Sequence, residues 1–304
     1  MNSLQGKWLF HGWQGITFET PVDWELAAVH GDAKKGYLSL DDGRMLRLEL
    51  KWEPSKSSLD IAKTVSHHLG TLRRKAGRKA PAPEVKRDLK LARLKGKDYE
   101  CFSVTNGMCS LNLLSRCQKC RRVILLSVLF NPDEDREKEG IFQRIVNSLR
   151  DHPSGGKINW ALYGLRFALP EKAHLSENTL RAGAIELKFR EPKGEISVAR
   201  IALAGSILRH KKLDSWFYER YGKRLTAFRY DAERTKFKGH LALEVKGETP
   251  RFRGFLPTIR RKEYLKALAW FCEVMDKIYV FLSIGKDKEG QTFERYSAAV
   301  ECHS

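Results

Sequence analysis

The alternation of hydrophobic and polar positions predicts short strands joined by tight turns. In segment 36–52, apolar and polar residues alternate on both sides of an Asp-Gly turn at Gly43. Such alternation places the apolar side chains on one face of a strand, and Asp-Gly is a frequent hairpin turn. Segment 183–203 repeats the pattern across a turn that contains Pro192 and Gly194. We therefore predict one antiparallel hairpin in each half of the chain.

A short motif indicates that the chain is an internal repeat. Gly15-Ile-Thr-Phe-Glu-Thr-Pro21 returns 149 residues later as Gly164-Leu-Arg-Phe-Ala-Leu-Pro170. Each copy predicts a strand that ends at a proline, which has no N–H to donate to a sheet. The Pro- and Gly-containing segment 152–157 predicts a linker between the copies. We expect two tandem modules, at residues 1–152 and 157–304.

A second alignment supports the repeat. Segment 114–130 aligns without gaps to segment 269–285, and the alignment places Cys117 opposite Cys272. Both segments predict two strands that are separated by a short polar turn. The match is one of pattern, with few identical residues.

Periodicity of the helical kind predicts four helices. Segment 58–72 carries apolar residues on one helical stripe, with Ser58 as its N-cap. Its counterpart in the second half is segment 213–225. Each module is expected to close with a further helix, at 133–149 and at 291–302.

Composition and charge narrow the class of protein. The 304 residues are 42% hydrophobic and 31% charged, as in a folded protein. A net charge of +19 favours polyanionic partners, namely RNA, DNA, a ribosomal surface or an acidic membrane face, and the alternative is a charge that serves solubility. No apolar run is long enough to span a bilayer, and the start at Met1 lacks signal-peptide features. We expect a cytoplasmic protein without a membrane partner, whose six cysteines are reduced thiols.

The order of predicted elements resembles the PsbP-like fold, shared by the photosystem II extrinsic subunit and the Mog-type Ran-binding nuclear-transport factor. The cues are the strand at 15–21 followed by Trp24, and the closing Phe142-Gln-Arg-Ile-Val-Asn-Ser148. The second half departs from the pattern at Ala173, where a Trp would be expected. The resemblance implies an α+β protein of two tandem modules, each an antiparallel sheet covered by helices as an α/β/α sandwich. Members of that fold are mostly adaptor or assembly proteins.

A basic segment is the first candidate binding site. Segment 73–97 carries eleven Lys and Arg residues against two acids, and its prolines and repulsion favour an extended arm without regular structure. Such an arm orders on a phosphate backbone. The alternative is a solvated loop. The candidate nucleic-acid contacts are Arg73, Arg74, Lys75, Arg78, Lys79, Lys86 and Arg87.

A second basic cluster lies in segment 251–262. Its phenylalanines interleave with arginines, a composition that can stack on unpaired bases while guanidinium groups hold phosphates. The alternative is a hairpin loop that binds nothing. The candidate contacts are Arg251, Phe252, Arg253, Arg260, Arg261 and Lys262.

Cysteines and histidines give weaker signals. Cys117-Gln-Lys-Cys120 is half of a zinc-binding pattern, and Cys109 would lie roughly 20 Å away along a strand. The pattern therefore favours two buried thiols, and we expect no metal and no cofactor. His67 and His68 fall on the predicted first helix, with His68 near its polar side.

The sequence predicts a binding protein and no enzyme, because no catalytic motif is recognisable. The main hypothesis is contact with nucleic acid or a ribonucleoprotein, such as the ribosome, through phosphates. The alternative is a protein–protein adaptor or assembly factor that uses the duplicated sheets, with charge serving solubility and steering. A third possibility is an enzyme whose site is assembled between the modules.

Overall fold

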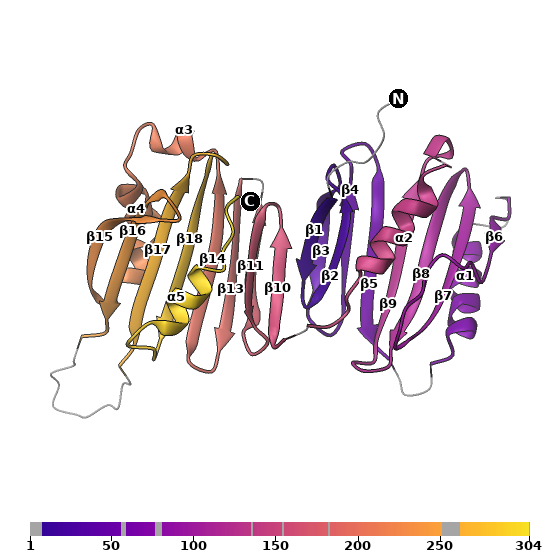
Figure 1. Cartoon of the computed structure of the whole chain (residues 1–304), viewed down its shortest axis with the longest axis horizontal. Coiled ribbons are helices and arrows are strands. Elements are labelled where there is room, and N and C mark those ends of the chain that lie inside the picture. Colours follow the sequence, from indigo (N-terminus) through magenta and orange to yellow (C-terminus); the bar gives the residue numbers. More distant parts are fainter. Residues whose placement is uncertain are drawn as a thin grey trace. The chain divides into compact units, whose positions relative to one another are not determined.

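The chain divides into two compact units. The computed structural model describes residues 8–55, 59–76, 81–134, 136–153, 155–181, 183–250 and 262–303. Unit 1 comprises residues 1–155 and 159–163, and unit 2 comprises residues 156–158 and 164–304 (Figure 1). Among the described residues, no helix combines the length and apolar character that a membrane crossing requires.

Unit 1 is built on a seven-stranded antiparallel sheet with the strand order β3-β4-β5-β9-β8-β7-β6. A smaller sheet contains the β1–β2 hairpin, and Gly12 of β1 pairs with Ala161 of β10. The strands are β1 (Trp8–Trp13), β2 (Ile16–Pro21), β3 (Glu25–Gly31), β4 (Gly36–Asp41), β5 (Leu46–Pro54), β6 (Glu84–Lys86), β7 (Lys97–Asn106), β8 (Met108–Cys117), β9 (Arg122–Phe130) and β10 (Lys157–Leu162). The helices are α1 (Ile61–Ala76), the 3-10 turn η1 (Pro132–Glu134) and α2 (Lys138–Ser148).

Unit 2 repeats this plan. Its seven-stranded antiparallel sheet has the order β12-β13-β14-β18-β17-β16-β15, which matches unit 1 strand for strand. The strands are β11 (Leu165–Pro170), β12 (His174–Arg181), β13 (Ala184–Glu191), β14 (Gly194–Ala202), β15 (Arg229–Phe237), β16 (His240–Glu248), β17 (Tyr264–Cys272) and β18 (Lys277–Gly285). The helices are α3 (Ala204–Leu208), α4 (Leu213–Leu225) and α5 (Gln291–Ser297).

The predicted hairpins are confirmed, because β4 pairs with β5 and β13 pairs with β14 in antiparallel register. The predicted fold class is wrong. Strands make up 51% of the structure and helices 20%, so the chain is a β-rich protein of antiparallel sheets and no PsbP-like helix-covered sandwich. The helices are too short for two covering layers: α5 ends at Ser297 and α2 begins at Lys138, inside the ranges that were predicted.

The basic segment 73–97 is also more ordered than predicted. Arg73, Arg74 and Lys75 form the last turn of α1. Lys and Arg are good helix formers, and positive charge at a helix C-terminus is attracted to the negative end of the helix dipole. Further along, β6 pairs with β7 at the edge of the sheet. Repulsion between neighbouring cations is therefore weaker here than the backbone hydrogen bonds of helix and sheet.

Replacing the glycine in the middle of α1 by alanine is expected to stabilise the fold. A Cβ built on Gly70 meets nothing within 4 Å, so Gly70→Ala should raise the free energy of unfolding by about 0.5–1 kcal/mol. Gly36→Ala is the opposing control, because its Cβ would lie 2.1 Å from the Trp52 ring and 2.5 Å from the backbone oxygen of His30. That variant should lose about 1–3 kcal/mol. Urea unfolding of both variants checks the pair, and equal effects would contradict the packing described.

Candidate functional site

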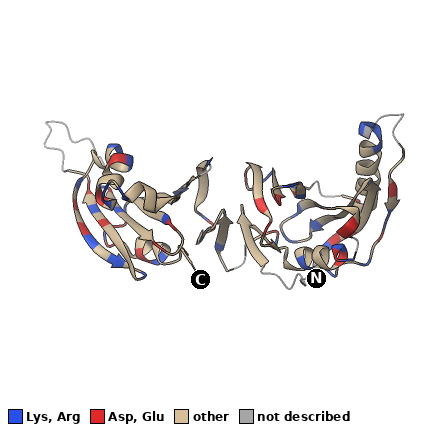
Figure 2. Cartoon of the chain, turned by 90° about the horizontal axis from the view of Figure 1, so that it is seen from above, with Lys and Arg blue, Asp and Glu red and all other residues tan. Residues whose placement is uncertain are grey.

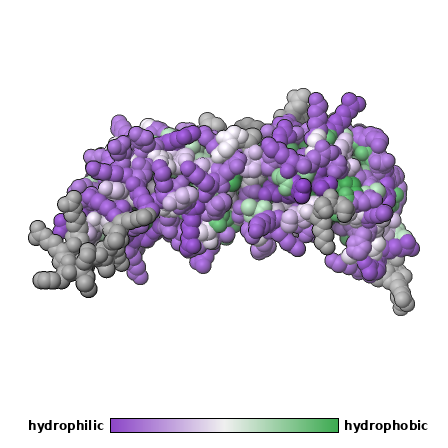
Figure 3. Space-filling view, turned by 90° about the horizontal axis from the view of Figure 1, so that it is seen from below, coloured by the Kyte–Doolittle hydropathy of each residue, from purple (hydrophilic) through white to green (hydrophobic). Residues whose placement is uncertain are grey.

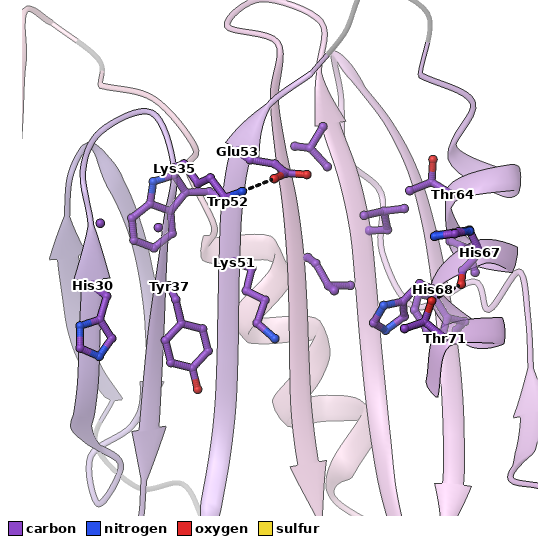
Figure 4. Close-up of a pocket in the computed structure, with 17 residues that line it drawn as sticks. His30, Lys35, Tyr37, Lys51, Trp52, Glu53, Thr64, His67, His68 and Thr71 are labelled. Carbon is purple, nitrogen blue, oxygen red and sulfur yellow. Dashed lines mark hydrogen bonds and ion pairs between the residues drawn. The ribbon is translucent and has the colours of Figure 1, made fainter. Parts of the chain in front are cut away.

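A pocket of about 640 Å³ opens in unit 1 between α1 and the sheet, and we call it the α1 groove (Figure 4). Its floor consists of apolar side chains from three neighbouring strands. These are Phe102 of β7, Leu114 of β8, and Val123 and Leu125 of β9. In Figure 4, strands β3, β4 and β5 form one side of the groove and α1 forms the other. The labelled lining residues are His30, Lys35, Tyr37, Lys51, Trp52, Glu53, Thr64, His67, His68 and Thr71.

The alternation within β5 creates the polar side of the groove. Leu50 and Trp52 are buried on one face of β5, whereas Lys51 between them is exposed. The Lys51 ammonium lies 5.4 Å from the centre of the Tyr37 ring, and the Tyr37 hydroxyl donates to Glu49 at 2.9 Å. These contacts hold the rim side chains of β4 and β5 against one another, so the wall is preorganised.

The groove exists because α1 covers little of the sheet. Among the α1 side chains that the structure describes, Val65 is the one that is fully buried, in a small cluster with Phe102 and Leu114. In unit 2, α4 covers the corresponding sheet with large side chains that join one extended core. The α4 residues in that core are Trp216, Phe217, Tyr221 and Leu225. Strand β14 is accordingly buried on both faces, whereas its counterpart β5 is exposed at Lys51 and Glu53.

The floor of the groove is uncharged, whereas its rim carries charged side chains. The His68 ring meets Phe102 edge-on at 6.2 Å. Burial lowers the pKa of His68 below its ordinary value, and the positive charges of Lys51 and Lys75 lower it further. His68 is therefore neutral at neutral pH. On the rim, Lys35 pairs with Glu53 at 3.4 Å.

His68 and the other groove residues were not recognised as a site from the sequence. His68 was assigned near the polar side of its helix, but it faces the apolar floor. Its neighbour His67 also lines the groove. The floor residues alternate within their own strands as ordinary core residues do, so they carry no signal of a cavity.

A second pocket, of about 660 Å³, lies in unit 2 between the α3–α4 connection and strands β15–β17. Leu241, which is 65% exposed, lies on its lining with Phe271. The surrounding side chains are mostly basic: Arg209, His210, Lys211, Lys212 and Arg234. Arg234 donates to Asp214 at 2.6 Å, so part of this charge is neutralised within the unit.

The structure describes some of the predicted nucleic-acid contacts, and three of these form ion pairs. Arg87 holds both carboxylate oxygens of Glu100, at 2.7 and 2.8 Å. Lys86 pairs with Glu84 at 3.2 Å, and Lys262 pairs with Glu248 at 2.6 Å. The other predicted contacts outside α1 fall outside the described residues: Arg78, Lys79, Arg251, Phe252, Arg253, Arg260 and Arg261.

In Figure 2, ribbon segments of basic and of acidic residues are interspersed along both units. Nothing in the described part of the structure supports the nucleic-acid binding that composition predicts.

The cysteines have neighbours that the sequence analysis did not consider. Cys117 and Cys120 lie with Asp151 and His152, which follow α2. Cys109 lies near the opposite end of the same strand β8. Among the described residues, one further group of potential metal ligands occurs in unit 2, formed by His240, Cys272, Cys302 and His303.

Comparison with known proteins gives no family for the chain. No family model matches it, and no curated protein does. Two solved structures are similar over nearly the whole length. The T6SS immunity protein TplEi from Pseudomonas aeruginosa is 9% identical, with a TM-score of 0.34 and complete coverage of both chains. A chain of the Tle4–Tli4 complex is 8% identical, with a TM-score of 0.37 and 99% coverage of both chains. Neither belongs to the PsbP-like proteins, and similarity at this level supports no conclusion about function.

Proposed function

We propose that the protein acts by binding a protein partner, without catalysis, and that apolar side chains of the partner enter the α1 groove. The observation that carries the proposal is the part of the apolar floor, on β9, that α1 leaves uncovered. Val123 and Leu125 are half-buried there, whereas the corresponding face of unit 2 is closed by α4. Apolar surface of this kind gains free energy when a partner covers it.

The dimensions and chemistry of the groove fit an anchoring side chain. A volume of about 640 Å³ accommodates one or two large side chains of a partner segment. An apolar floor inside a polar rim is the usual anatomy of a hot spot in a protein interface. Figure 3 shows one face, on which small patches of hydrophobic residues in unit 1 lie among hydrophilic residues.

Charge adds steering to this picture. The net charge of +19 favours a partner with an acidic surface around its anchor. Complementary charge raises the rate of association more than it raises affinity. The affinity itself should then come mainly from the apolar floor.

Filling the groove should weaken partner binding. Thr64→Trp places an indole on the groove side of α1, and Lys63→Trp places the same indole on a position whose side chain is 87% exposed. We expect Thr64→Trp to reduce affinity by roughly 30–100-fold and Lys63→Trp to change it by less than about twofold. The immobilised wild-type chain and both variants are compared in their capture of proteins from a lysate of the producing cells.

The comparison of variants decides the result. A protein retained by the wild type and Lys63→Trp but not by Thr64→Trp would support binding in the groove. The same set of proteins on all three columns, or no retained protein, would contradict it. Circular dichroism of each variant checks that the fold is intact.

A further inference from the structure

Four potential ligand atoms converge in unit 1 where β8 ends. Cys117 is the last residue of β8, and Cys120 lies in the turn before β9. The Cys117 sulfur is 3.7 Å from His152 Nδ1, and the Cys120 sulfur is 3.9 Å from Asp151 Oδ2. All four ligand atoms lie within 4.8 Å of one another.

The corresponding corner of unit 2 contains a second group of four. Cys272 is the last residue of β17, and its sulfur is 3.3 Å from His303 Nδ1. The Cys302 sulfur is 3.4 Å from the same nitrogen and 3.6 Å from His240 Nε2. These four ligand atoms also lie within 4.8 Å of one another.

The two groups occupy equivalent places in the repeat. Cys117 and Cys272 end equivalent strands, β8 and β17. His152 and His303 each lie two residues after a residue that bridges the β2 or β11 strand, as the pairs Thr17↔Arg150 and Arg166↔Glu301 show. A Cys–His pair is therefore common to both units.

The remaining ligands differ between the units, but their number does not. In unit 2, Met275 stands at the place of Cys120, so one donor is lost. His240 restores the number, because it opens β16 where Lys97 opens β7 in unit 1. The two groups differ in individual ligands but each contains four. This constancy of number indicates that the four ligands act together.

We propose that each unit binds one Zn²⁺ ion, through Cys117, Cys120, Asp151 and His152 in unit 1 and through His240, Cys272, Cys302 and His303 in unit 2. Tetrahedral zinc with bonds of about 2.0–2.3 Å requires ligand atoms roughly 3.3–3.8 Å apart. Five separations between ligand atoms, of 3.3–3.9 Å, fit that geometry, and the other pairs lie within 4.8 Å. Two sulfurs with imidazole or carboxylate are the donors that zinc prefers.

The surrounding charges match the two ligand sets. Two thiolates and one carboxylate leave a zinc ion in unit 1 with a net charge of −1, and Lys97 lies 3.2 Å from Asp151 Oδ1 to offset it. Two thiolates and two neutral imidazoles make the unit 2 site neutral, and there the place of Lys97 is taken by His240. In unit 1 the Arg122 guanidinium, which donates to the backbone oxygen of Asp151, adds a second positive charge beside the more negative ligand set.

Backbone N–H groups around the sulfurs complete the surroundings of a bound ion. The Cys120 N–H lies 3.5 Å from the Cys117 sulfur, and the N–H groups of Val274 and Met275 donate to the Cys272 sulfur. Donors aimed at a sulfur stabilise its negative charge and orient it. The turn after each strand therefore presents a sulfur ready to bind a cation.

A catalytic thiol is a poorer explanation of the unit 1 group. In a Cys–His–Asp arrangement, the nucleophile and the carboxylate bind opposite nitrogens of the imidazole. Here the Cys117 sulfur and Asp151 Oδ1 both approach His152 Nδ1, and Cys117 is 2% exposed. Convergence on one point is the geometry of a metal site.

Metal content and cobalt spectroscopy of the full chain test the proposal. The reduced protein is stripped with a chelator and titrated with Zn²⁺ and, separately, with Co²⁺, whose thiolate complexes absorb in the near ultraviolet and visible. We expect about two ions per chain, with tetrahedral thiolate–cobalt bands, and about one ion in Cys117→Ser and in Cys272→Ser. Cys109→Ser, near the other end of β8, is the matched control and should keep two.

The results separate the alternatives. No thiolate–cobalt bands in the reduced wild-type protein would overturn the proposal without reliance on any variant. So would retention of two ions by the double variant Cys117→Ser/Cys272→Ser. Alkylation and mass spectrometry of the protein as purified would show whether the sulfurs are instead joined as disulfides, which would also overturn it.

Discussion

Replacing Trp270 by alanine is expected to lower the free energy of unfolding by about 3–5 kcal/mol. Trp270 is fully buried in β17 of unit 2. Its ring stacks on Tyr279 at a centroid distance of 5.4 Å and meets Phe237 edge-on at 4.9 Å. Alanine would leave a cavity where these two rings lose their partner, and a rigid sheet collapses only partly around such a void. Urea unfolding followed by circular dichroism measures the loss.

The exposed turn after β17 supplies the control for this prediction. Val274 is 73% exposed, so Val274→Ala should change the free energy of unfolding by less than about 0.5 kcal/mol. A loss below about 1 kcal/mol for Trp270→Ala, or equal losses for the two variants, would contradict the packing of unit 2.

Acid should destabilise unit 1 through His11. Burial lowers the pKa of His11 from 6.5 to about 4, with its ring stacked on Phe18 and Nε2 lying 2.8 Å from the Thr20 hydroxyl. Between these pH values the unfolded chain binds a proton that the folded chain does not. This contribution to stability is therefore complete above pH 6.5 and falls as the pH falls, by about 1.4 kcal/mol per pH unit. The total loss by pH 4 is about 3 kcal/mol.

A substitution that removes the titrating ring of His11 isolates its contribution to the acid sensitivity. His11→Gln retains a hydrogen-bonding group near Thr20 but takes up no proton in this range. Free energies of unfolding at several pH values from 7 to 4 should fall less steeply in His11→Gln than in the wild type. Parallel curves would show that His11 does not carry the acid sensitivity.

The sequence predicted the elements whose side-chain pattern is strong. Segment 213–225 was predicted as a helix, and α4 spans Leu213–Leu225. The alternating segments 36–52 and 183–203 form hairpins, as expected. In each of these segments the periodicity reflects one buried face, which is the feature that sequence patterns record.

The fold class was wrong because edge strands carry no such pattern. Strand β15 is exposed over most of its length, and its residues Arg229–Phe237 read as a polar loop. Strand β12 is similar. Both pair with a neighbour through the backbone, and their side chains face solvent on both sides. Without them the sheets seemed smaller and the helices more prominent than they are.

The candidate sites were missed for a different reason. The α1 groove joins residues as far apart as His30 and Leu125, and no spacing rule relates them. The ligand groups were within reach of the sequence, because the repeat that aligned Cys117 with Cys272 also places His152 and His303 after equivalent helices. Extending the alignment to the residues after each closing helix would have connected them.

The binding role of the α1 groove is tested most directly by titration calorimetry with the captured partner. We expect Thr64→Trp to raise the dissociation constant by roughly 30–100-fold and Lys63→Trp to leave it within about twofold. We also expect a modest response to salt, because the anchor is apolar. Equal affinity of wild type and Thr64→Trp would contradict the account. A fall in affinity of about 10³–10⁵-fold between 50 and 200 mM salt would also contradict it, because such a fall is typical of phosphate recognition.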